Sequence, residues 1–585
     1  MKLKKMLAVL VAVFILAIGI GGCSSNGVAA NEVLIWAITG SDNAAWLTEM
    51  EREFEAENSD IGIVVRATFA EYNSILTNFA RGNSPDIVYV DDEYFKRYAD
   101  GGFIAPLDDL IEEYWADSEL VDVSEIWEPA LARYRYEVSN NTSDADDPLY
   151  CIPKDMDPTV LYYNEGAFEE LGITVISVDE EDLVAWNADK IADANGKKKS
   201  DYEALAGVGN VPARGYWRSD GNWVSGTTWR APESSATLVF NNRIPMSWDE
   251  VEDLAMLCTD SYNPGVSPTT YGYYTEWWFN YGWSVGGDCI GDTTGNGDYV
   301  FTLNDDAPNY KVLKAMNVNG TDYAPGTDDV PVFLSYEDKQ FLAQNSSVAD
   351  GLVADGSIEA YPSTLDAFTR FCALSRDKTS SDPTGLAVSP KPSVVPTASD
   401  ALGRFNTGGD LAMFVGYSSY VASISDAVDW NIAPLPVYKT YSGYNTVGQF
   451  GARAGHSKST GLAIAADSEK KEMAMQVLAY LSGTPGQSAL AQQHYYLPNT
   501  EEVARTDYLT DTSKNYEQFL VETRYQDPGD WWYMLDREWI ANWSEPLNQN
   551  PNSVRNSGMT LTQYFSTVVA QTNRDLQMYK EALGN

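Results

Sequence analysis

The sequence predicts an α/β fold built on a parallel sheet, and two observations support this prediction. Between residues 33 and 114, apolar runs rich in β-forming residues alternate with segments whose apolar residues recur at helical spacing. Strands that alternate with helices form parallel sheets that are covered on both faces. The chain also has 585 residues, which is too many for one hydrophobic core, so we expect two or three domains.

The first elements are the most clearly marked. Val33–Ile38 is an apolar run that predicts a buried strand, and Ser41 or Asp42 can cap a helix that extends to about Glu57. Further strands are expected at Ile61–Phe69 and Asp86–Val90, and helices at Tyr72–Arg81, Asp92–Tyr98 and Leu107–Tyr114.

Later segments repeat the same pattern. Leu149–Ile152 and Val160–Tyr163 are strand-like runs on either side of Pro153, and this arrangement suits a crossing between two lobes. Gly461–Ala466 predicts another strand, which a helical segment follows. Leu561–Tyr579 predicts a final helix.

Ligands of such sheets bind beyond the carboxyl ends of the strands. Trp36 lies near the end of the first predicted strand, Asp91 and Asp92 follow the third, and Asp155 lies at a later strand end. Carboxylates accept strong hydrogen bonds from hydroxyl groups, so we expect at least one of the three in a ligand site. Each alone also fits a solvated surface position.

The N-terminus carries a targeting signal. Lys2, Lys4 and Lys5 precede the apolar run Met6–Ile20, which is shorter than the roughly 20 residues that span a bilayer, so residues 1–22 are expected to be a signal peptide. Ile20-Gly21-Gly22-Cys23 resembles the bacterial lipobox, which implies that Cys23 is lipidated and that residues 23–31 form a tether. The alternative is ordinary signal cleavage with an unmodified Cys23. Lipidation would place the protein on the extracellular face of the bacterial cell membrane.

Charge and cysteine content exclude several classes of protein. The chain has 39 Lys and Arg against 84 Asp and Glu, a formal net charge of −45, which repels nucleic acids and strongly anionic ligands. The spacing of the cysteines gives no zinc or redox motif. One or two disulfides could form outside the cell, and the sequence leaves all three complete pairings open among Cys151, Cys258, Cys289 and Cys372.

The stretch Thr275–Asp288 (TEWWFNYGWSVGGD) is the strongest candidate for a binding surface. Indole and phenol rings combine a flat apolar face with a hydrogen-bonding edge, which suits the C–H faces and hydroxyl rims of a pyranose. Trp283 is the first choice for a stacking platform, with Trp277, Trp278 and Tyr281 as alternates. An aromatic core segment that ends in a Gly turn explains the composition equally well.

An ordered set of segments carries a family resemblance. From about Val33 to Leu490 the chain is similar to extracellular solute-binding proteins of the carbohydrate family, the relatives of maltose-binding protein, in blocks that include NSPDIVYVDDEYF, IPMSWDEVEDL, GWSVGGD, RFNTGGDLAMFVGYSSY and GLAIAADSEKKEMAMQVLAYL. The resemblance implies a two-lobe periplasmic-binding-protein-like α/β fold of the class II type. It also implies a hinge, a ligand cleft between the lobes and delivery of the ligand to an ABC importer.

The resemblance also divides the chain. Lobe 1 is expected at residues 32–150 and 456–490, lobe 2 at 151–455, and helices mostly of lobe 2 at 491–585. Two stretches, at about 174–243 and 312–361, are insertions that are longer than the corresponding segments of the family. The first contains a helix candidate at Glu180–Leu205 and hairpin candidates around Trp217, Trp223 and Trp229. These tryptophans belong either to a lid over the binding surface or to a self-packed subdomain.

The resemblance supplies further site candidates. Tyr417 and Tyr420 in GYSSY align with a segment that faces the family's cleft, and Trp532 falls where the family often has a late cleft aromatic. Arg453 lies in the Gly-rich turn before the return strand, where it binds ligand or balances local acid. Side chains with oxygen atoms alternate along the chain at Asp292, Asn296 and Asp298, and this pattern suggests a calcium site. Leu303 occupies the position of the required Glu, so we favour a solvated turn and expect no metal or other cofactor.

The function expected from this resemblance is capture of a carbohydrate, with an oligosaccharide favoured, by closure of two lobes. The partners would be the sugar and the permease subunits of an ABC transporter, with contact to the membrane only through the lipid anchor. We expect a monomer without enzymatic activity. The alternatives are a receptor for a peptide, polyamine or aromatic metabolite, a glycoside hydrolase with two catalytic carboxylates, and a surface adhesin without a transporter.

Overall fold

The computed structural model describes residues 31–582 except 117, 140, 222–228, 380–383, 443–445, 495, 528, 530–533 and 536. The predicted signal peptide, Cys23, most of the tether, Trp223 and Trp532 therefore lie outside the described residues. Within the described part of the chain, no helix has both the length and the apolarity to cross a bilayer.

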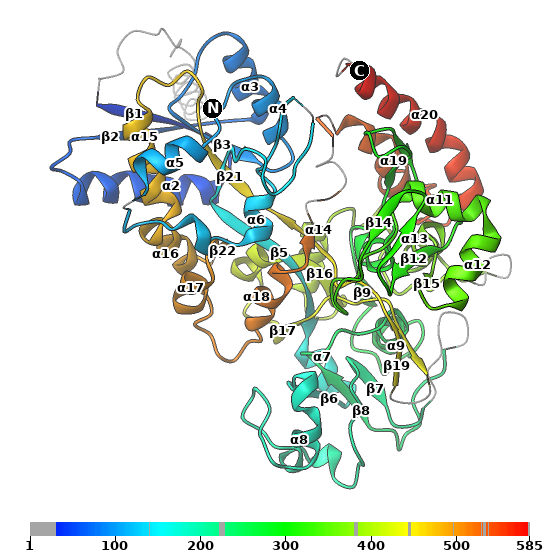
Figure 1. Cartoon of the computed structure of the whole chain (residues 1–585). Helices are drawn as coiled ribbons and strands as arrows, with labels where there is room; N and C mark the ends of the chain where they lie inside the picture. The colour runs from blue at the N-terminus through cyan, green and yellow to red at the C-terminus, as the bar shows by residue number, and fades with distance from the viewer. Residues whose placement is uncertain are drawn as a thin grey trace, which may run out of the picture.

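Lobe 1 is built on a five-stranded sheet with the order β2-β1-β3-β21-β4 (Figure 1). β1 pairs in parallel with β2 and β3, whereas β21 runs antiparallel to β3 and β4. The strands are β1 (Glu32–Ile38), β2 (Val64–Ala70), β3 (Ile87–Asp91), β4 (Ile152–Pro153) and β21 (Thr460–Ile464). All the predicted strands of this lobe are present, because their apolar residues are those that the sheet buries.

Helices cover both faces of this sheet, as a parallel α/β sheet requires. Trp46, Met50 and Phe54 are buried on one face of α2, as their helical spacing predicts. The Trp46 indole donates to the carbonyl oxygen of Gly486 at 3.0 Å and so joins α2 to α16. The helices are α2 (Ser41–Glu57), α3 (Tyr72–Ala80), α4 (Phe95–Asp100), α5 (Asp108–Tyr114), α6 (Glu128–Ala132), α15 (Lys471–Ser482) and α16 (Thr484–Gln492).

Lobe 2 is organised around β5 (Asp155–Asn164), in which every residue is buried. Successive side chains of a strand point to opposite faces. Met156, Val160 and Tyr162 therefore enter one hydrophobic core, and Leu161 and Tyr163 enter another. The sheet has the order β23-β20-β5-β16-β9, and β17 and β22 also pair with β5. These strands are β9 (Tyr271–Tyr274), β16 (Leu411–Tyr417), β17 (Trp430–Ala433), β20 (Gly455–Lys458), β22 (Leu497–Pro498) and β23 (Gln526–Asp527).

Helices of lobe 2 begin at clear sequence signals. Ser247, Ser363 and Thr397 each form a capping box with an acidic residue three positions later. The predicted last helix is confirmed as α20, and it packs against α19. The helices are α7 (Glu165–Glu170), α9 (Trp248–Cys258), α10 (Phe279–Gly282), α13 (Thr364–Ala373), α14 (Ala398–Phe405), α17 (Glu501–Val503), α18 (Glu517–Thr523), α19 (Glu538–Asn548) and α20 (Leu561–Ala582).

The first insertion forms a small sheet below lobe 2 in Figure 1, made of β6 (Ile173–Ile176), β7 (Tyr216–Arg218) and β8 (Leu238–Asn241). Trp217 joins Trp186 in the insertion's own hydrophobic cluster, which favours the self-packed alternative for this residue, whereas Trp229 packs against the lobe 2 core. The predicted helix at Glu180–Leu205 is wrong. Only α8 (Leu183–Asn187) and short 3₁₀ turns form there, because the Asp193 carboxylate accepts backbone N–H groups and closes a turn instead.

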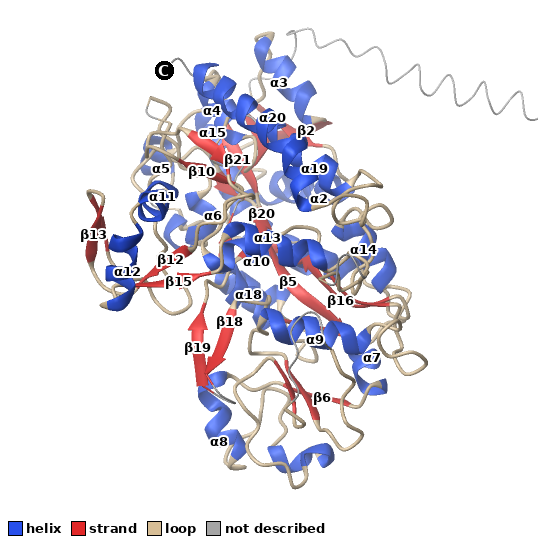
Figure 2. Cartoon of the chain, turned by 90° about the vertical axis from the view of Figure 1, so that its right-hand side faces the viewer, coloured by secondary structure: helices blue, strands red, loops and turns tan. Residues whose placement is uncertain are grey.

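The second insertion projects from lobe 2, and Figure 2 shows its hairpin and two helices at one edge of the molecule. It also has its own small hydrophobic cluster, which includes Val312, Leu342 and Ile358. Its elements and their neighbours are β10 (Ile290–Asp292), β11 (Tyr299–Phe301), β12 (Asn309–Val312), β13 (Met316–Val318), β14 (Thr321–Tyr323), α11 (Tyr336–Gln344), α12 (Ser346–Ala354), β15 (Ile358–Tyr361), β18 (Lys439–Ser442) and β19 (Thr446–Phe450).

The chain passes between the lobes at adjacent points. β4 of lobe 1 leads through Lys154 into β5 of lobe 2, and β20 of lobe 2 leads through Ser459 into β21 of lobe 1. A third passage runs from α16 to β22, which pairs with the start of β5. Short passages that lie side by side are the geometry of a hinge.

The cysteines do not form the disulfides that the sequence left open. Cys151, Cys258 and Cys372 are buried free thiols, and Cys289 is buried in lobe 2. Burial raises the pKa of the first three thiols, so they remain protonated at neutral pH.

Candidate ligand site at the lobe junction

A pocket lies where β9 and β16 of lobe 2 end, at the carboxyl edge where ligands of α/β sheets bind. We call it the junction pocket. Its cavity volume is about 20 Å³, which is enough for about one water molecule. A sugar ring therefore enters only if the lining moves. The pocket is lined by Thr159, Thr275, Glu276, Trp277, Phe279, Asn280, Ala398, Val415, Gly416, Tyr417 and His456.

Aromatic rings form one wall of the junction pocket. Phe279 stacks against Trp283 with a centroid distance of 4.2 Å and an interplanar angle of 11°, and against Trp277 at 5.8 Å and 24°. The Trp283 indole N–H donates to Asp288 Oδ1 at 3.1 Å, which fixes the ring plane. Both tryptophans are half-buried, so each keeps surface that a ligand can reach. Trp283 and Trp277 therefore stay predicted ligand contacts.

Tyr417 forms part of the opposite wall. Its backbone carbonyl accepts a hydrogen bond from Tyr162 at 2.7 Å, and the ammonium group of Lys458 lies 4.8 Å from its ring centroid. Tyr420 does not line the pocket. Its ring meets Tyr417 edge-on at 5.7 Å and packs against Phe414, so it supports Tyr417 from behind.

The polar side chains of Thr159, Glu276 and Asn280 also line the pocket, although the sequence did not single them out as ligand contacts. Thr159 donates to the His456 carbonyl at 2.7 Å, and Asn280 donates to the Ala454 carbonyl at 3.3 Å. Glu276 accepts the N–H of Ala398 at the start of α14. Burial raises the pKa of Glu276. Glu276 and Asn280 lie within the aromatic stretch that the sequence marks, so that stretch contained the signal for them.

His456 is an uncharged polar group in this pocket. Burial, together with the charges of Arg133 and Lys458, lowers its pKa to about 3. Its Nδ1 lies 3.2 Å from the carbonyl oxygen of Asp527. A neutral imidazole can both donate and accept a hydrogen bond, and this suits a ligand hydroxyl group.

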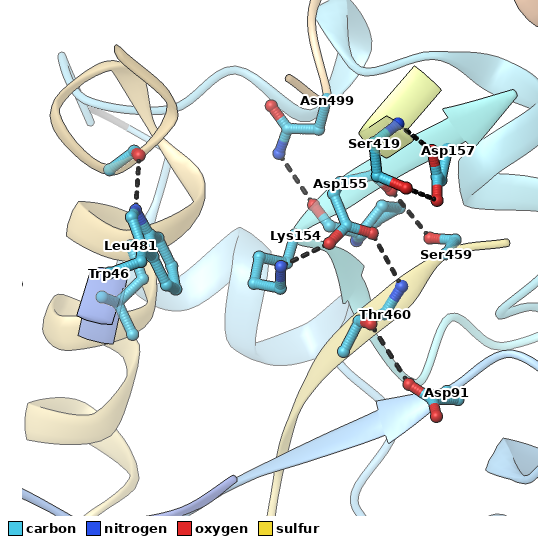
Figure 3. Close-up of polar contacts among 12 residues, drawn as sticks. Trp46, Asp91, Lys154, Asp155, Asp157, Ser419, Ser459, Thr460, Leu481 and Asn499 are labelled. Carbon is cyan, nitrogen blue, oxygen red and sulfur yellow. Dashed lines mark hydrogen bonds and ion pairs between the residues drawn. The ribbon is translucent and has the colours of Figure 1, made fainter. Parts of the chain in front are cut away.

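The predicted strand-end carboxylates are hinge residues (Figure 3). Asp155 pairs with Lys154 and accepts the N–H of Thr460 at 2.9 Å, and both members of the ion pair are almost fully buried. Asp91 accepts from the Thr460 hydroxyl at 3.1 Å. The Asp155 carboxylate therefore joins β5 of lobe 2 to β21 of lobe 1, and it does not line the junction pocket.

Asp92 has the same kind of role. It is buried and pairs with Arg133 at 2.7 Å, and Arg133 also donates to the Ser457 carbonyl at 2.9 Å. Its carboxylate is occupied by this ion pair, so the structure gives Asp92 a structural role at the hinge and does not place it in the junction pocket. Burial raises the pKa of both Asp91 and Asp92 to about 6.

Sequence reasoning missed Asp157, although it lies two residues after a candidate. Its carboxylate accepts from the Ser418 hydroxyl, the Ser419 N–H and the Ser419 hydroxyl, each at 2.8 Å (Figure 3). Burial raises the pKa of Asp157 to about 6, although these hydrogen bonds act to lower it. Asp157 fixes the turn after Tyr417 and so positions that wall of the junction pocket.

Three other predicted contacts lie elsewhere. Trp278 is a core residue, since its side chain is 0% exposed and packs edge-on against Phe368. Trp36 lies inside β1, because the strand continues to Ile38, and its ring packs edge-on against Phe79 at 5.5 Å. Arg453 balances local acid by pairing with Glu522 at 2.7 Å.

The turn that we favoured over a calcium site is present between Asp292 and Asp298. Asp292 accepts the N–H groups of Thr294, Gly297 and Asp298, which closes the turn between β10 and β11. Asn296 donates to the Thr294 carbonyl, and Asp298 pairs with Lys580. Among the described residues, no group of three or more His, Cys, Asp or Glu side chains could hold a metal ion.

Comparison with known proteins agrees with this geometry. The chain has a two-lobe α/β fold with a pocket on the lobe 2 side of the lobe junction, and residues 37–231 match the family model "Bacterial extracellular solute-binding protein". That match covers one third of the chain. The resemblance seen in the sequence is therefore confirmed. No curated protein matches the chain significantly.

Solved structures share the fold over nearly the whole chain. An ABC substrate-binding protein of Listeria monocytogenes in complex with cycloalternan is 17% identical with a TM-score of 0.53, covering 93% of this chain and 99% of that one. The sugar-binding protein MalE of Xanthomonas citri is 13% identical with a TM-score of 0.53, covering 94% and 98%. UgpB of Mycobacterium tuberculosis in complex with glycerophosphocholine is 15% identical with a TM-score of 0.50, covering 95% and 99%. The predicted two-lobe periplasmic-binding-protein-like fold is thereby confirmed.

Proposed function

We propose that this protein is the extracellular substrate-binding protein of an ABC importer and captures a carbohydrate, an oligosaccharide in preference to a single sugar, by closure of its two lobes. The observation that supports the proposal most directly is the composition of the junction pocket. It combines stacked indole and phenyl rings with neutral hydrogen-bonding groups from Thr159, Asn280 and His456. Rings supply apolar contact to the faces of a sugar, and the polar groups supply partners for its hydroxyls.

The proposal also includes a cellular location and binding partners. Lipidation at Cys23 would hold the protein on the outer face of the cell membrane, where closed, ligand-loaded protein would dock on permease subunits. We expect a monomer. Globomycin, which blocks lipoprotein signal cleavage, should retain the precursor in the membrane, and Cys23→Ser should release the protein from it. Unchanged fractionation of Cys23→Ser would contradict the anchor.

The binding proposal is tested by calorimetry with malto-, cello- and xylo-oligosaccharides. Covering about 100 Å² of ring and sugar surface contributes roughly 2–3 kcal/mol, so Trp283→Ala should weaken the best ligand at least tenfold. Val184→Ala is the matched control, because Val184 is 82% exposed and distant from the lobe junction. If every sugar fails to bind the unmodified protein, or Trp283→Ala binds as well as the control, the carbohydrate assignment is wrong.

A receptor for a cationic solute is the second candidate, and Glu276 is the observation that favours it. Its half-buried carboxylate lines the junction pocket, and a bound cation would stabilise its charged form. Titration with spermidine distinguishes the two candidates. Binding of spermidine that weakens with salt and is lost in Glu276→Gln would support the cationic solute, whereas sugar binding should tolerate salt.

The proposal assigns no catalysis to the chain. Release of reducing ends or of an aryl leaving group from the same oligosaccharides would contradict it. Stoichiometric binding without turnover is the expected result, and it separates a receptor from a glycoside hydrolase.

A further inference from the structure

A second cavity lies beside Trp283, and the second insertion forms its outer wall. We call it the insertion pocket. Its volume is about 250 Å³, which is below the roughly 300–1,000 Å³ of a pocket for a drug-sized ligand. Its inner wall comes from the turn after α10 and from the β10–β11 hairpin, and α11 closes it from outside. Its polar and aromatic lining includes Asp288, Tyr299, Asn309, Tyr336, Lys339 and Thr364.

The insertion is fitted to this wall through two glycines. A Cβ atom on Gly291 would lie 2.4 Å from the Tyr336 ring, and one on Gly286 would lie 2.3 Å from the Phe333 ring. Both rings therefore rest directly on backbone, and any other residue at these positions would displace them. The insertion is thus a fixed part of the cavity rather than a loosely attached loop.

The cavity contains buried polar groups, one of which lacks a partner. The Thr364 hydroxyl, on a residue that is 1% exposed, lines the cavity and has no hydrogen-bond partner among the residues that the structure describes. Lys339 is 4% exposed and donates to Asn309 at 2.9 Å while pairing with Asp305. A buried hydroxyl without a partner costs about 1–3 kcal/mol, which a bound hydroxyl group would recover.

The fixed charges favour an uncharged occupant. Asp288 and Asp292 line the same cavity as Lys339, so an anion would meet two carboxylates and a cation would meet a buried ammonium group. A neutral molecule with several hydroxyls can bond to both kinds of group. The half-buried rings of Tyr299 and Tyr336 supply apolar faces.

The insertion pocket adjoins the junction pocket across a single indole ring. Trp283 stacks on Phe279, which lines the junction pocket, and donates to Asp288, which lines the insertion pocket. Asp288 also influences the surroundings of the junction pocket. Burial raises the pKa of Asp527, whose carbonyl oxygen contacts His456, to about 6, and the negative charge of Asp288 is the next largest cause. One elongated ligand can therefore contact both pockets.

We propose that the insertion pocket is an additional sugar subsite, which accepts a further ring of the oligosaccharide that occupies the junction pocket. This inference depends on the proposed function. It gives the second insertion a role: the insertion extends the site beyond Trp283 and selects longer chains. Thr364 and Lys339 would bond to the hydroxyls of the added ring, and Tyr336 would cover one of its faces.

Calorimetry with one oligosaccharide series, from disaccharide to hexasaccharide, tests the subsite. The affinity of the unmodified protein should rise at the length that first reaches the insertion pocket. Tyr336→Ala should abolish that rise, a loss of about tenfold, while the binding of the shortest ligand stays unchanged. Thr364→Val should weaken only the longer chains, by about threefold to tenfold, which corresponds to a hydroxyl hydrogen bond.

Two controls keep the result interpretable. Thr364→Val removes a hydroxyl without a partner, so its thermal midpoint should equal or exceed that of the unmodified protein. Val348→Ala changes an exposed side chain of α12 in the same insertion and should leave all affinities unchanged. If no sugar binds the unmodified protein, the proposed function fails. If sugars bind but affinity is independent of length, or the variants change all lengths equally or none, the subsite is wrong.

Discussion

At the scale of single residues, buried ion pairs determine how firmly the lobes are joined. Arg133 is 1% exposed and connects Asp92 of lobe 1 with Ser457 in the strand that leads into the hinge. An ion pair of this kind is weak evidence for stability, but removing one partner leaves a buried charge uncompensated.

We therefore expect Arg133→Met to lower the free energy of unfolding by about 3–5 kcal/mol. Urea unfolding measures this, with Arg52→Ala as the control because Arg52 is 73% exposed and its pairs lie on the surface. Adding Asp92→Asn to Arg133→Met should recover part of the loss by removing the unpaired charge. A double variant no more stable than Arg133→Met would show that packing, not charge, is responsible.

Asp157 provides a pH prediction at the same scale. Burial raises its pKa from 3.8 to about 6, so the folded state binds this proton more tightly than the unfolded chain does. The stability that this group contributes is then fully present below its usual pKa and is lost as the pH rises through about 6. Relative to Asp157→Asn, the unmodified protein should become less stable between about pH 4 and pH 7.

The size of this change follows from the shift, at 1.36 kcal/mol for each pKa unit, and is on the order of 3 kcal/mol. Asparagine keeps the shape and can still accept from Ser418 and from the Ser419 N–H, so the comparison isolates the charge. Urea unfolding across this pH range is the measurement. A stability difference that does not change with pH would mean that the carboxyl is not protonated in the folded state.

At the scale of elements, the sequence predicts what local apolar spacing determines. The strands and helices of lobe 1 lie within a few residues of their predicted positions, because each buries the residues that define its period. The stretch Glu180–Leu205 lacks such a period, and side-chain bonds from Asp193 decide its structure instead. Local spacing also cannot tell which face an aromatic residue occupies, so Trp278 stayed an alternate to Trp283 in the sequence although its side chain is fully buried and that of Trp283 is not.

The short helix α10 illustrates this difference and can be tested. A Cβ atom on Gly282 would lie 1.9 Å from the Trp278 ring, so that ring fills the space beside the backbone. Gly282→Ala should force Trp278 out of its core position and destabilise lobe 2 by about 1–3 kcal/mol. Thermal unfolding measures the effect, and Gly403→Ala is the control because Gly403 lies in α14 with open space around it. Equal midpoints for both variants would place Trp278 outside the core.

At the scale of the whole molecule, the sheet order joins distant parts of the sequence. β21 lies between β3 and β4 although about 370 residues separate β21 from β3, and no local pattern predicts such a pairing. Only the family resemblance indicated this return of the chain to lobe 1. For the same reason, sequence spacing could not distinguish the hinge carboxylates Asp92 and Asp155 from ligand contacts, since their partners Arg133 and Thr460 come from other elements.

The hinge gives the last prediction. The junction pocket is lined by lobe 2 and is too small for a sugar ring unless its lining moves, and a ligand that also contacts lobe 1 should stabilise the closed state. We expect the radius of gyration to fall, and tryptophan fluorescence to change, as a bound oligosaccharide saturates the protein. Small-angle scattering and a parallel fluorescence titration measure both quantities. Trp283→Ala, at the same sugar concentration, should show neither change until binding is restored at higher concentration. Saturable binding in calorimetry with a constant radius would mean that the ligand enters by local side-chain movement and that the lobes do not close around it.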